Sequence, residues 1–199
     1  MTARPTLAFS RPDPSEESNI ASNLIDSEDV RTLLADRGSQ VDAVARLHGR
    51  LAENPAEEVI DLGEHLRDIS AAVVAALASS GNIRLHFTCD GPCALPTERA
   101  LSVGFIVVEL VTNAVKYAHP TGVPGEIKVA CTQASDGTVS VEVSDDGVGL
   151  PEGMDPMKAD SLGLRIVHSL AAQLGARVGF EHSPLGLSCV LQIPGGPHA

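Results

Sequence analysis

The chain has few basic residues. Its 199 residues include 14 Lys and Arg against 26 Asp and Glu, so the formal net charge is −12 and the isoelectric point is near 4.9. Proteins that bind nucleic acid directly neutralise its phosphates with a clustered basic surface. The composition therefore argues against a nucleic-acid partner. An anionic ligand must instead be held by local features such as helix N-termini, backbone amides or a metal ion.

Long apolar runs are also missing. The first ten residues, MTARPTLAFS, lack the continuous apolar segment of a signal peptide. The longest strongly apolar stretch, residues 71–78, is far too short to span a bilayer. We therefore expect a cytoplasmic protein with no direct membrane span.

Cysteines number only four, and in a cytoplasmic protein they are expected to be reduced thiols in the core or on the surface. One local group could be interpreted as a metal site, namely His86, Cys89 and Cys93. They supply three candidate ligands with no second paired motif, whereas structural zinc usually takes four. The sequence therefore gives little support to a structural metal here.

What remains is ordinary globular composition, with 43% hydrophobic and 20% charged residues. This length allows one compact domain and a small appendage. Residues 1–26 contain three prolines among polar residues and are predicted to be a flexible segment. Residues 27–60 have apolar positions at helical spacing, and residues 61–195 are predicted to form the main domain.

The main domain alternates helical and strand patterns, which predicts an α+β fold with helices on one face of a mostly antiparallel sheet. Helical periodicity extends over residues 62–79, 97–119 and 161–174. Alternating patterns predict strands at residues 82–87, 126–131, 138–144, 177–181 and 187–193.

The helix at 97–119 carries one narrow polar arc on an otherwise apolar surface. At about 100° per residue, Glu109, Thr112, Asn113 and Lys116 fall together. A helix that is apolar on most sides is buried, so these polar groups need partners. They form either a capping network or exposed edge, or a metal–phosphate site with a carboxylate, an amide oxygen and an ammonium.

A second polar group follows the strand at 138–144, in the run Asp145-Asp146-Gly147-Val148-Gly149. The glycines allow a sharp turn that can approach a flat ligand closely. An aspartate that accepts a hydrogen bond from an exocyclic amine would select adenine over guanine. A simple hairpin turn is the other interpretation of this short motif.

The third feature is the start of the helix at 161–174, where Ser161 and Gly163 occupy the first turn. Backbone amides at a helix N-terminus that follows a loop can bind an anion without basic side chains. An ordinary capped helix is the alternative.

Taken together, VELVTNAVKYAHP, SDDGVGLP and SLGLRIVHSLAAQLGA resemble the N, G1 and G2 boxes of the GHKL ATPase superfamily. They look most like the HWE-like, type 2 group of two-component sensor histidine kinases. Residues 27–60 resemble the latter part of that group's helical dimerisation and phosphotransfer region. The resemblance implies a Bergerat-type two-layer α/β sandwich, a mixed and mostly antiparallel sheet covered by helices.

The resemblance also implies roles for the residues of the first two boxes, with ATP and Mg²⁺ as cofactors. Glu109 would be the catalytic acid that polarises the attacking group, Asn113 the Mg²⁺ ligand and Lys116 a phosphate contact. Asp145 would bind the adenine amino group.

The remaining glycines and leucines of the boxes would line the nucleotide. Gly147 and Gly149 would shape the adenine wall. Gly163, with its neighbours Leu162 and Leu164, would border the phosphates beneath a short lid at residues 151–160.

One feature of the family is missing. The region Pro5 to Leu24, where the phosphoacceptor helix is expected, has no histidine and three prolines, each costing a helix about 3 kcal/mol or more. His48 is the first histidine, and its setting resembles a position past the acceptor. The phosphoacceptor is thus unknown: the helix is degenerate or truncated, through loss or a shortened gene start, or the acceptor lies on another chain.

The resemblance predicts an enzyme, an ATP-dependent protein histidine kinase of a bacterial two-component system. Its expected partners are a response regulator or a histidine-containing protein, and a second copy in a homodimer. Two alternatives stay open, a non-catalytic phosphotransfer or response-regulator docking protein, and an anti-sigma-type serine kinase. The dimerisation-like segment disfavours the serine kinase.

Overall fold

The computed structural model describes residues 59–78, 82–119, 123–151, 153–157, 161–183 and 186–195. The flexible segment predicted at 1–26 and almost all of the helical segment predicted at 27–60 lie outside these residues. So do Pro5 to Leu24, His48 and part of the predicted lid.

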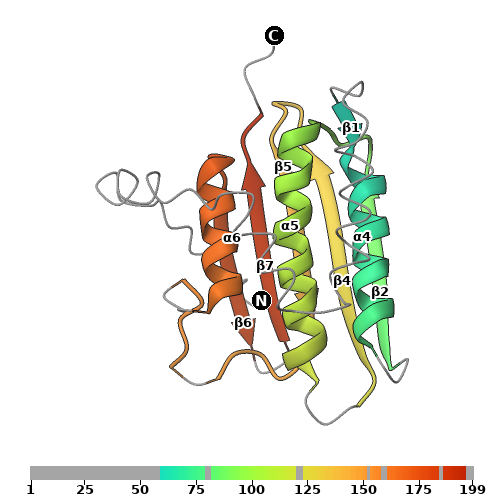
Figure 1. The fold of residues 1–199 in the computed structure, drawn as a ribbon, viewed down its shortest axis with the longest axis vertical. Coiled ribbons are helices and arrows are strands. Elements are labelled where there is room, and N and C mark those ends of the chain that lie inside the picture. Colours follow the sequence, from blue (N-terminus) through green and yellow to red (C-terminus); the bar gives the residue numbers. More distant parts are fainter. Residues whose placement is uncertain are drawn as a thin grey trace, which may run out of the picture.

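The described chain is built on one five-stranded sheet (Figure 1). Its strand order is β2-β4-β5-β7-β6, with β2 parallel to β4 and every other neighbouring pair antiparallel. The sheet is therefore mixed and mostly antiparallel, as the sequence predicted. The strands are β2 (Ile83–Asp90), β4 (Gly125–Gln133), β5 (Val139–Asp145), β6 (Arg177–Ser183) and β7 (Gly186–Ile193).

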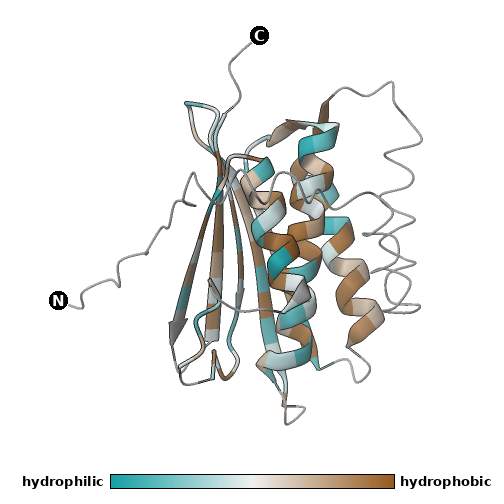
Figure 2. Cartoon of the chain, turned by 60° about the vertical axis from the view of Figure 1, so that its left-hand side comes forward, coloured by the Kyte–Doolittle hydropathy of each residue, from teal (hydrophilic) through white to brown (hydrophobic). Residues whose placement is uncertain are grey.

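Three helices cover one face of this sheet, which gives the predicted two layers (Figure 2). They are α4 (Leu62–Leu77), α5 (Thr97–Asn113) and α6 (Leu162–Gln173). Alternation along β5 explains the layering, since Val139, Val141 and Val143 are buried while Glu142 is exposed. The apolar row packs with the helices into one core.

Two very short strands were not predicted. Strand β1 (Val59–Asp61) pairs antiparallel with β3 (Ala94–Pro96) to form a separate two-stranded sheet. Strand β1 crosses the predicted boundary between residues 60 and 61, and Asp61 then caps α4 by accepting a hydrogen bond from the Glu64 amide at 3.1 Å. The chain thus enters the domain through a short strand and a capped helix.

Among the described residues, one helical stretch, Thr97–Ala118, is long and apolar enough to cross a membrane. It is longer than the apolar run at 71–78 that the sequence singled out. This stretch is the central helix of the helical layer and packs against α4, α6 and the sheet. Its apolar surface therefore belongs to the core. A buried core helix can have the same length and apolar composition as a helix that crosses a membrane.

Candidate functional site

The three predicted boxes lie at one end of the sandwich. Helix α5 ends there, β5 delivers Asp145 there, and α6 begins there (Figure 1). This convergence follows from the directions of the elements, because α5 and β5 run toward this end and α6 runs away from it. The boxes are separated in sequence but share one end of the sheet.

The polar arc is present on α5, but its last turn is not α-helical. Glu109 and Asn113 are partly buried and Lys116 is exposed, while Thr112 is buried with 9% of its surface accessible. From Ala114 to Ala118 the chain forms a π-helical turn, η2. A π turn adds a residue to the helical repeat, so the uniform α spacing assumed for Lys116 was wrong. Such turns are frequent at functional sites.

The η2 turn contacts the glycine loop directly. The Val148 amide donates to the Ala118 carbonyl at 2.9 Å. A Cβ added to Gly147 would overlap the same Ala118 carbonyl. Gly147 is therefore required by close backbone approach, whereas Gly149 is required by its positive φ of 69°. The structure thus joins the end of the polar helix to the loop that follows β5.

Asp145 is held by one carboxylate oxygen. Its Oδ1 accepts hydrogen bonds from the amides of Gly147 at 3.0 Å and Leu187 at 3.3 Å. Within the described residues, Oδ2 has no hydrogen-bond partner. Burial raises the pKa of the Asp145 carboxyl, opposed by the two amide hydrogen bonds. The side chain is fixed in orientation with one acceptor atom left for a ligand.

Strand β7 supports Asp145 in a way the sequence did not reveal. Gly186 has a φ of 125°, and a Cβ there would overlap the Asp145 carbonyl. The next residue, Leu187, supplies one of the two amides to Asp145. A glycine that opens a strand is a weak sequence signal. Only the pairing of β5 with β7 shows which residue it serves.

A second carboxylate, Asp146, closes the other side of the loop. Its Oδ1 accepts a hydrogen bond from the Glu126 amide at 2.7 Å and lies 3.0 Å from Nε2 of His119. In spite of this short distance, the His119 Nε2 atom has no hydrogen-bond partner among the described residues. Gly125 leaves room for the buried ring. His119 thus packs within the local structure of this loop.

The start of α6 is capped, which is the alternative that the sequence left open for this helix. Ser161 is the N-cap residue, and its Oγ accepts a hydrogen bond from the Leu164 amide at 3.4 Å. Leu162 is the first residue of the helix, Gly163 is buried and Leu164 is partly buried. Helix α6 packs against α5, which brings this first turn to the same end as the other two boxes.

The structure separates His86 from the two cysteines that lie near it in the sequence. His86 alternates to the opposite, exposed side of β2, where Nε2 lies 3.6 Å from the Glu126 carboxylate. It is replaced by Cys131, whose thiol lies beside those of Cys89 and Cys93. Sequence spacing could not find Cys131, because only the register of β2 with β4 brings it there.

Comparison with known families identifies the domain. Residues 98–196 match the family described as histidine kinase-, DNA gyrase B-, and HSP90-like ATPase. This part of the chain belongs to that family. The ATPase match spans the α5 polar arc, the Asp145 loop and the start of α6, so the predicted superfamily is confirmed.

Curated relatives of the ATPase domain are sensor kinases. Blue-light-activated histidine kinase 2 of Erythrobacter litoralis is 29% identical over 168 residues, which are 79% of this chain and 48% of that protein. Sensor histidine kinase PdtaS of Mycobacterium tuberculosis is 30% identical over 169 residues, 83% of this chain and 33% of that protein. The chain thus spans about half the length of the first relative and a third of the second.

A solved structure agrees with the fold. The histidine kinase domain of the Erythrobacter litoralis EL346 blue-light-activated histidine kinase matches with a TM-score of 0.72 and 25% identity, over 90% of this chain and 93% of that chain. The two-layer arrangement predicted from the sequence is therefore confirmed for the ATPase domain.

Proposed function

We propose that this chain carries the ATP-binding catalytic module of a two-component histidine kinase, which transfers a phosphoryl group from Mg-ATP to a histidine on another chain. The observation that carries the proposal is the state of Asp145. One oxygen of its carboxylate is used to hold the loop, and the other is available at the end of β5, beside the η2 turn.

Adenine fits this arrangement chemically. Oδ2 of Asp145 accepts a hydrogen bond from the exocyclic amine, a charge-assisted bond that guanine, with a carbonyl at that position, cannot donate. Gly147 and Gly149 let the loop take the conformation that holds Asp145 beside the η2 turn. The half-buried setting of Asp145 strengthens such a bond relative to one in open water.

The phosphates and Mg²⁺ fit the residues of α5, η2 and α6. The half-buried Asn113 side chain has no hydrogen-bond partner among the described residues, and its amide oxygen suits a hard cation. When bound, Mg²⁺ would neutralise phosphate charge. Glu109 would orient and polarise the attacking imidazole, and Lys116 would contact the phosphates. The first turn of α6, with Gly163 between Leu162 and Leu164, would supply backbone amides.

The partners follow from the relatives, which are named as histidine kinases. We propose a homodimer that forms through residues upstream of the ATPase domain and acts on a response regulator. Because its proposed substrate is ATP, we expect the module to lie in the cytoplasm. The phosphoacceptor stays unassigned, since the region from Pro5 to Leu24 contains no histidine.

Calorimetric titration of the full chain with ATP, with and without Mg²⁺, tests the nucleotide site. Asp145→Ala should weaken binding about 10- to 100-fold, because a hydrogen bond to a charged group is worth about 1.5–3 kcal/mol. Asn113→Ala should remove the dependence on Mg²⁺. Asp136→Ala is the matched control: that exposed carboxylate accepts the Thr138 amide at 2.9 Å in the β4–β5 turn, at the other end of the sheet.

Labelled ATP then separates the possible functions. We expect little acid-labile label on the chain alone and acid-labile label on an added histidine-containing partner. Acid-stable label on a protein substrate would point to a serine kinase. No ATP binding at all would favour the docking protein. Strong acid-labile self-labelling that survives His48→Ala would contradict the missing acceptor.

A further inference from the structure

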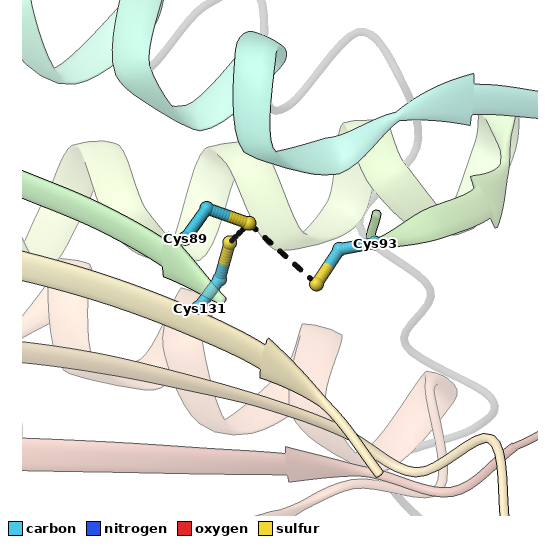
Figure 3. Close-up of side chains that lie close together, drawn as sticks. All are labelled: Cys89, Cys93 and Cys131. Carbon is cyan, nitrogen blue, oxygen red and sulfur yellow. Dashed lines mark hydrogen bonds between the residues drawn. The ribbon is translucent and has the colours of Figure 1, made fainter. Parts of the chain in front are cut away.

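Three cysteine thiols converge at the end of the domain opposite the Asp145 loop (Figure 3). Cys89 and Cys131 are register partners on the parallel strands β2 and β4, and Cys93 lies just before β3. The Cys89 Sγ is 2.7 Å from the Cys131 Sγ and 3.7 Å from the Cys93 Sγ. All three sulfur atoms lie within 4.8 Å of one another.

One of the two short separations matches that of a thiolate metal site. Thiolates bound tetrahedrally to zinc at about 2.3 Å stand about 3.8 Å from each other. The Cys89–Cys93 pair has this spacing, whereas the Cys89 and Cys131 sulfur atoms, 2.7 Å apart, would have to separate by about 1 Å to bind one ion. Cys93 and Cys131 are buried whereas Cys89 is partly exposed, so an ion has an approach from the solvent side.

The N-terminus of α4 lies over the same thiols. A Cβ added to Gly63 would stand 2.8 Å from the Cys89 Sγ and 3.1 Å from the Asp61 Oδ1. The Leu62 amide donates to the Cys93 carbonyl at 2.7 Å. A helix N-terminus stabilises negative charge nearby, and glycine at position 63 leaves the sulfur room.

We propose that Cys89, Cys93 and Cys131 bind one Zn²⁺ ion through three thiolates, with the fourth position open on the Cys89 side. Each thiol loses its proton to solvent as its sulfur–zinc bond forms, so three protons leave and no group is oxidised or reduced. Soft thiolate ligands select zinc or copper(I). Three thiolates bound to Zn²⁺ carry a net charge of −1, which is smaller in magnitude than their charge with copper(I). This charge faces the α4 N-terminus and the carboxylate of Asp61.

Burial disfavours the charged form of two of the three thiols. Burial raises the pKa of the Cys93 thiol to about 11 and raises the pKa of Cys131 as well. Both groups are therefore neutral thiols without metal, and zinc must displace their protons.

The site would fasten the entry of the chain into the ATPase domain. Its ligands come from β2, β4 and the segment before β3, and β3 pairs with β1, which precedes α4. A bound ion would link these elements directly at the point where residues 27–58 join the domain. Zinc should therefore stabilise the domain without taking part in the proposed phosphoryl transfer.

Titration of the reduced full chain with Co²⁺, followed by displacement with Zn²⁺, tests the proposal. We expect one equivalent of Co²⁺, a sulfur-to-cobalt charge-transfer band, and release of about three protons per ion. Cys89→Ser, Cys93→Ser and Cys131→Ser should each weaken binding more than about 100-fold, since loss of an outer partner of a ligand alone costs 10- to 100-fold.

Cys189 provides the matched control. It is a buried cysteine on β7 outside the cluster, so Cys189→Ser should bind Co²⁺ like the wild type. Gly63→Ala, which leaves every cysteine in place, should weaken binding because its methyl group crowds the Cys89 sulfur. Circular dichroism of each variant shows whether it is folded, and only folded variants count.

Several results would overturn the site. One is the absence of Co²⁺ and Zn²⁺ binding by a folded chain with four reduced thiols. Another is an equal loss in Cys189→Ser and Cys93→Ser. A chain purified without reductant that shows two free thiols after denaturation would indicate a disulfide in place of the metal. Binding of Cu⁺ alone would exclude the divalent ion.

Discussion

At the scale of single residues, Asp145 combines two requirements that oppose each other. A ligand-binding carboxylate has to be partly withdrawn from water, and that withdrawal raises its pKa. The amides of Gly147 and Leu187 offset part of the cost by hydrogen bonding to Oδ1. The residue therefore lowers the stability of the domain in its ionised form while supplying the proposed adenine contact.

Asp145→Asn should separate these two effects. Asparagine keeps an oxygen for the Gly147 and Leu187 amides, which leaves its NH₂ group facing the ligand. The affinity for ATP should fall about 10- to 100-fold, because the NH₂ group of the asparagine and the exocyclic amine of adenine are both hydrogen-bond donors. The discrimination against GTP should shrink, since the guanine carbonyl accepts from NH₂. Calorimetry with both nucleotides measures this change.

The same variant has a predicted pH signature in stability. Because the folded-state pKa of Asp145 is raised, ionisation costs stability above that pKa and costs nothing below the unfolded-state pKa. Asp145→Asn should therefore be at least as stable as the wild type at neutral pH, and the difference should shrink as the pH falls through the raised pKa. Thermal unfolding at several pH values checks this; a variant that is less stable at neutral pH contradicts it.

At the scale of elements, the loop after β5 depends on backbone conformation. Gly149 has a φ of 69°, in the region that L-residues rarely adopt. Gly149→Ala should destabilise the domain by about 1 kcal/mol and also weaken ATP binding, because the loop must shift to relieve the strain. Chemical denaturation and calorimetry on the same sample measure the two effects.

Gly175 offers a matched control for that substitution. It has a φ of 62° after α6, and a Cβ there would make only an ordinary 3.8 Å contact with Pro194. Gly175→Ala should cost about the same stability. The ATP affinity of this variant should stay at the wild-type value, since Gly175 lies at the end of α6 opposite to the proposed nucleotide site. Equal losses of ATP affinity in both variants would mean that general destabilisation is responsible.

The elements with a clear period were predictable from sequence. The three helices begin within a residue of their predicted starts, and the five sheet strands fall within a few residues of their predicted bounds. Strands β1 and β3 were missed because three residues cannot show a period, and their pairing is non-local. The parallel pairing of β2 with β4 was missed for the same reason, since alternation does not reveal a neighbour.

The candidate site was predictable where its residues lie in motifs. Glu109 and Asn113 stood out as polar residues on an apolar helix, and Asp145 as the residue between a strand and a glycine turn. The roles of Gly186 and Leu187 behind Asp145, and of Cys131 beside Cys89, arise from strand register. The η2 turn was hidden because its residues, Ala114 to Ala118, fit an α-helix equally well by composition.

At the scale of the whole molecule, the two proposed sites occupy opposite ends of one sheet. Strand β4 connects them, since Ile127 pairs with Asp145 near the loop and Cys131 pairs with Val141 and Cys89 at the other end. Four residues of strand separate these positions, roughly 13 Å. The core between them contains buried valines that pack closely.

This separation predicts that the two sites act independently. Substitutions more than about 7–10 Å apart without shared partners have additive effects within about 0.5 kcal/mol. Cys93→Ser should therefore leave ATP affinity unchanged, Asp145→Asn should leave Co²⁺ affinity unchanged, and the change in stability of the double variant should equal the sum of the two single changes. Denaturation and titration of all four proteins complete the cycle. A coupling well above that limit would show that the entry of the chain communicates with the nucleotide end through the sheet.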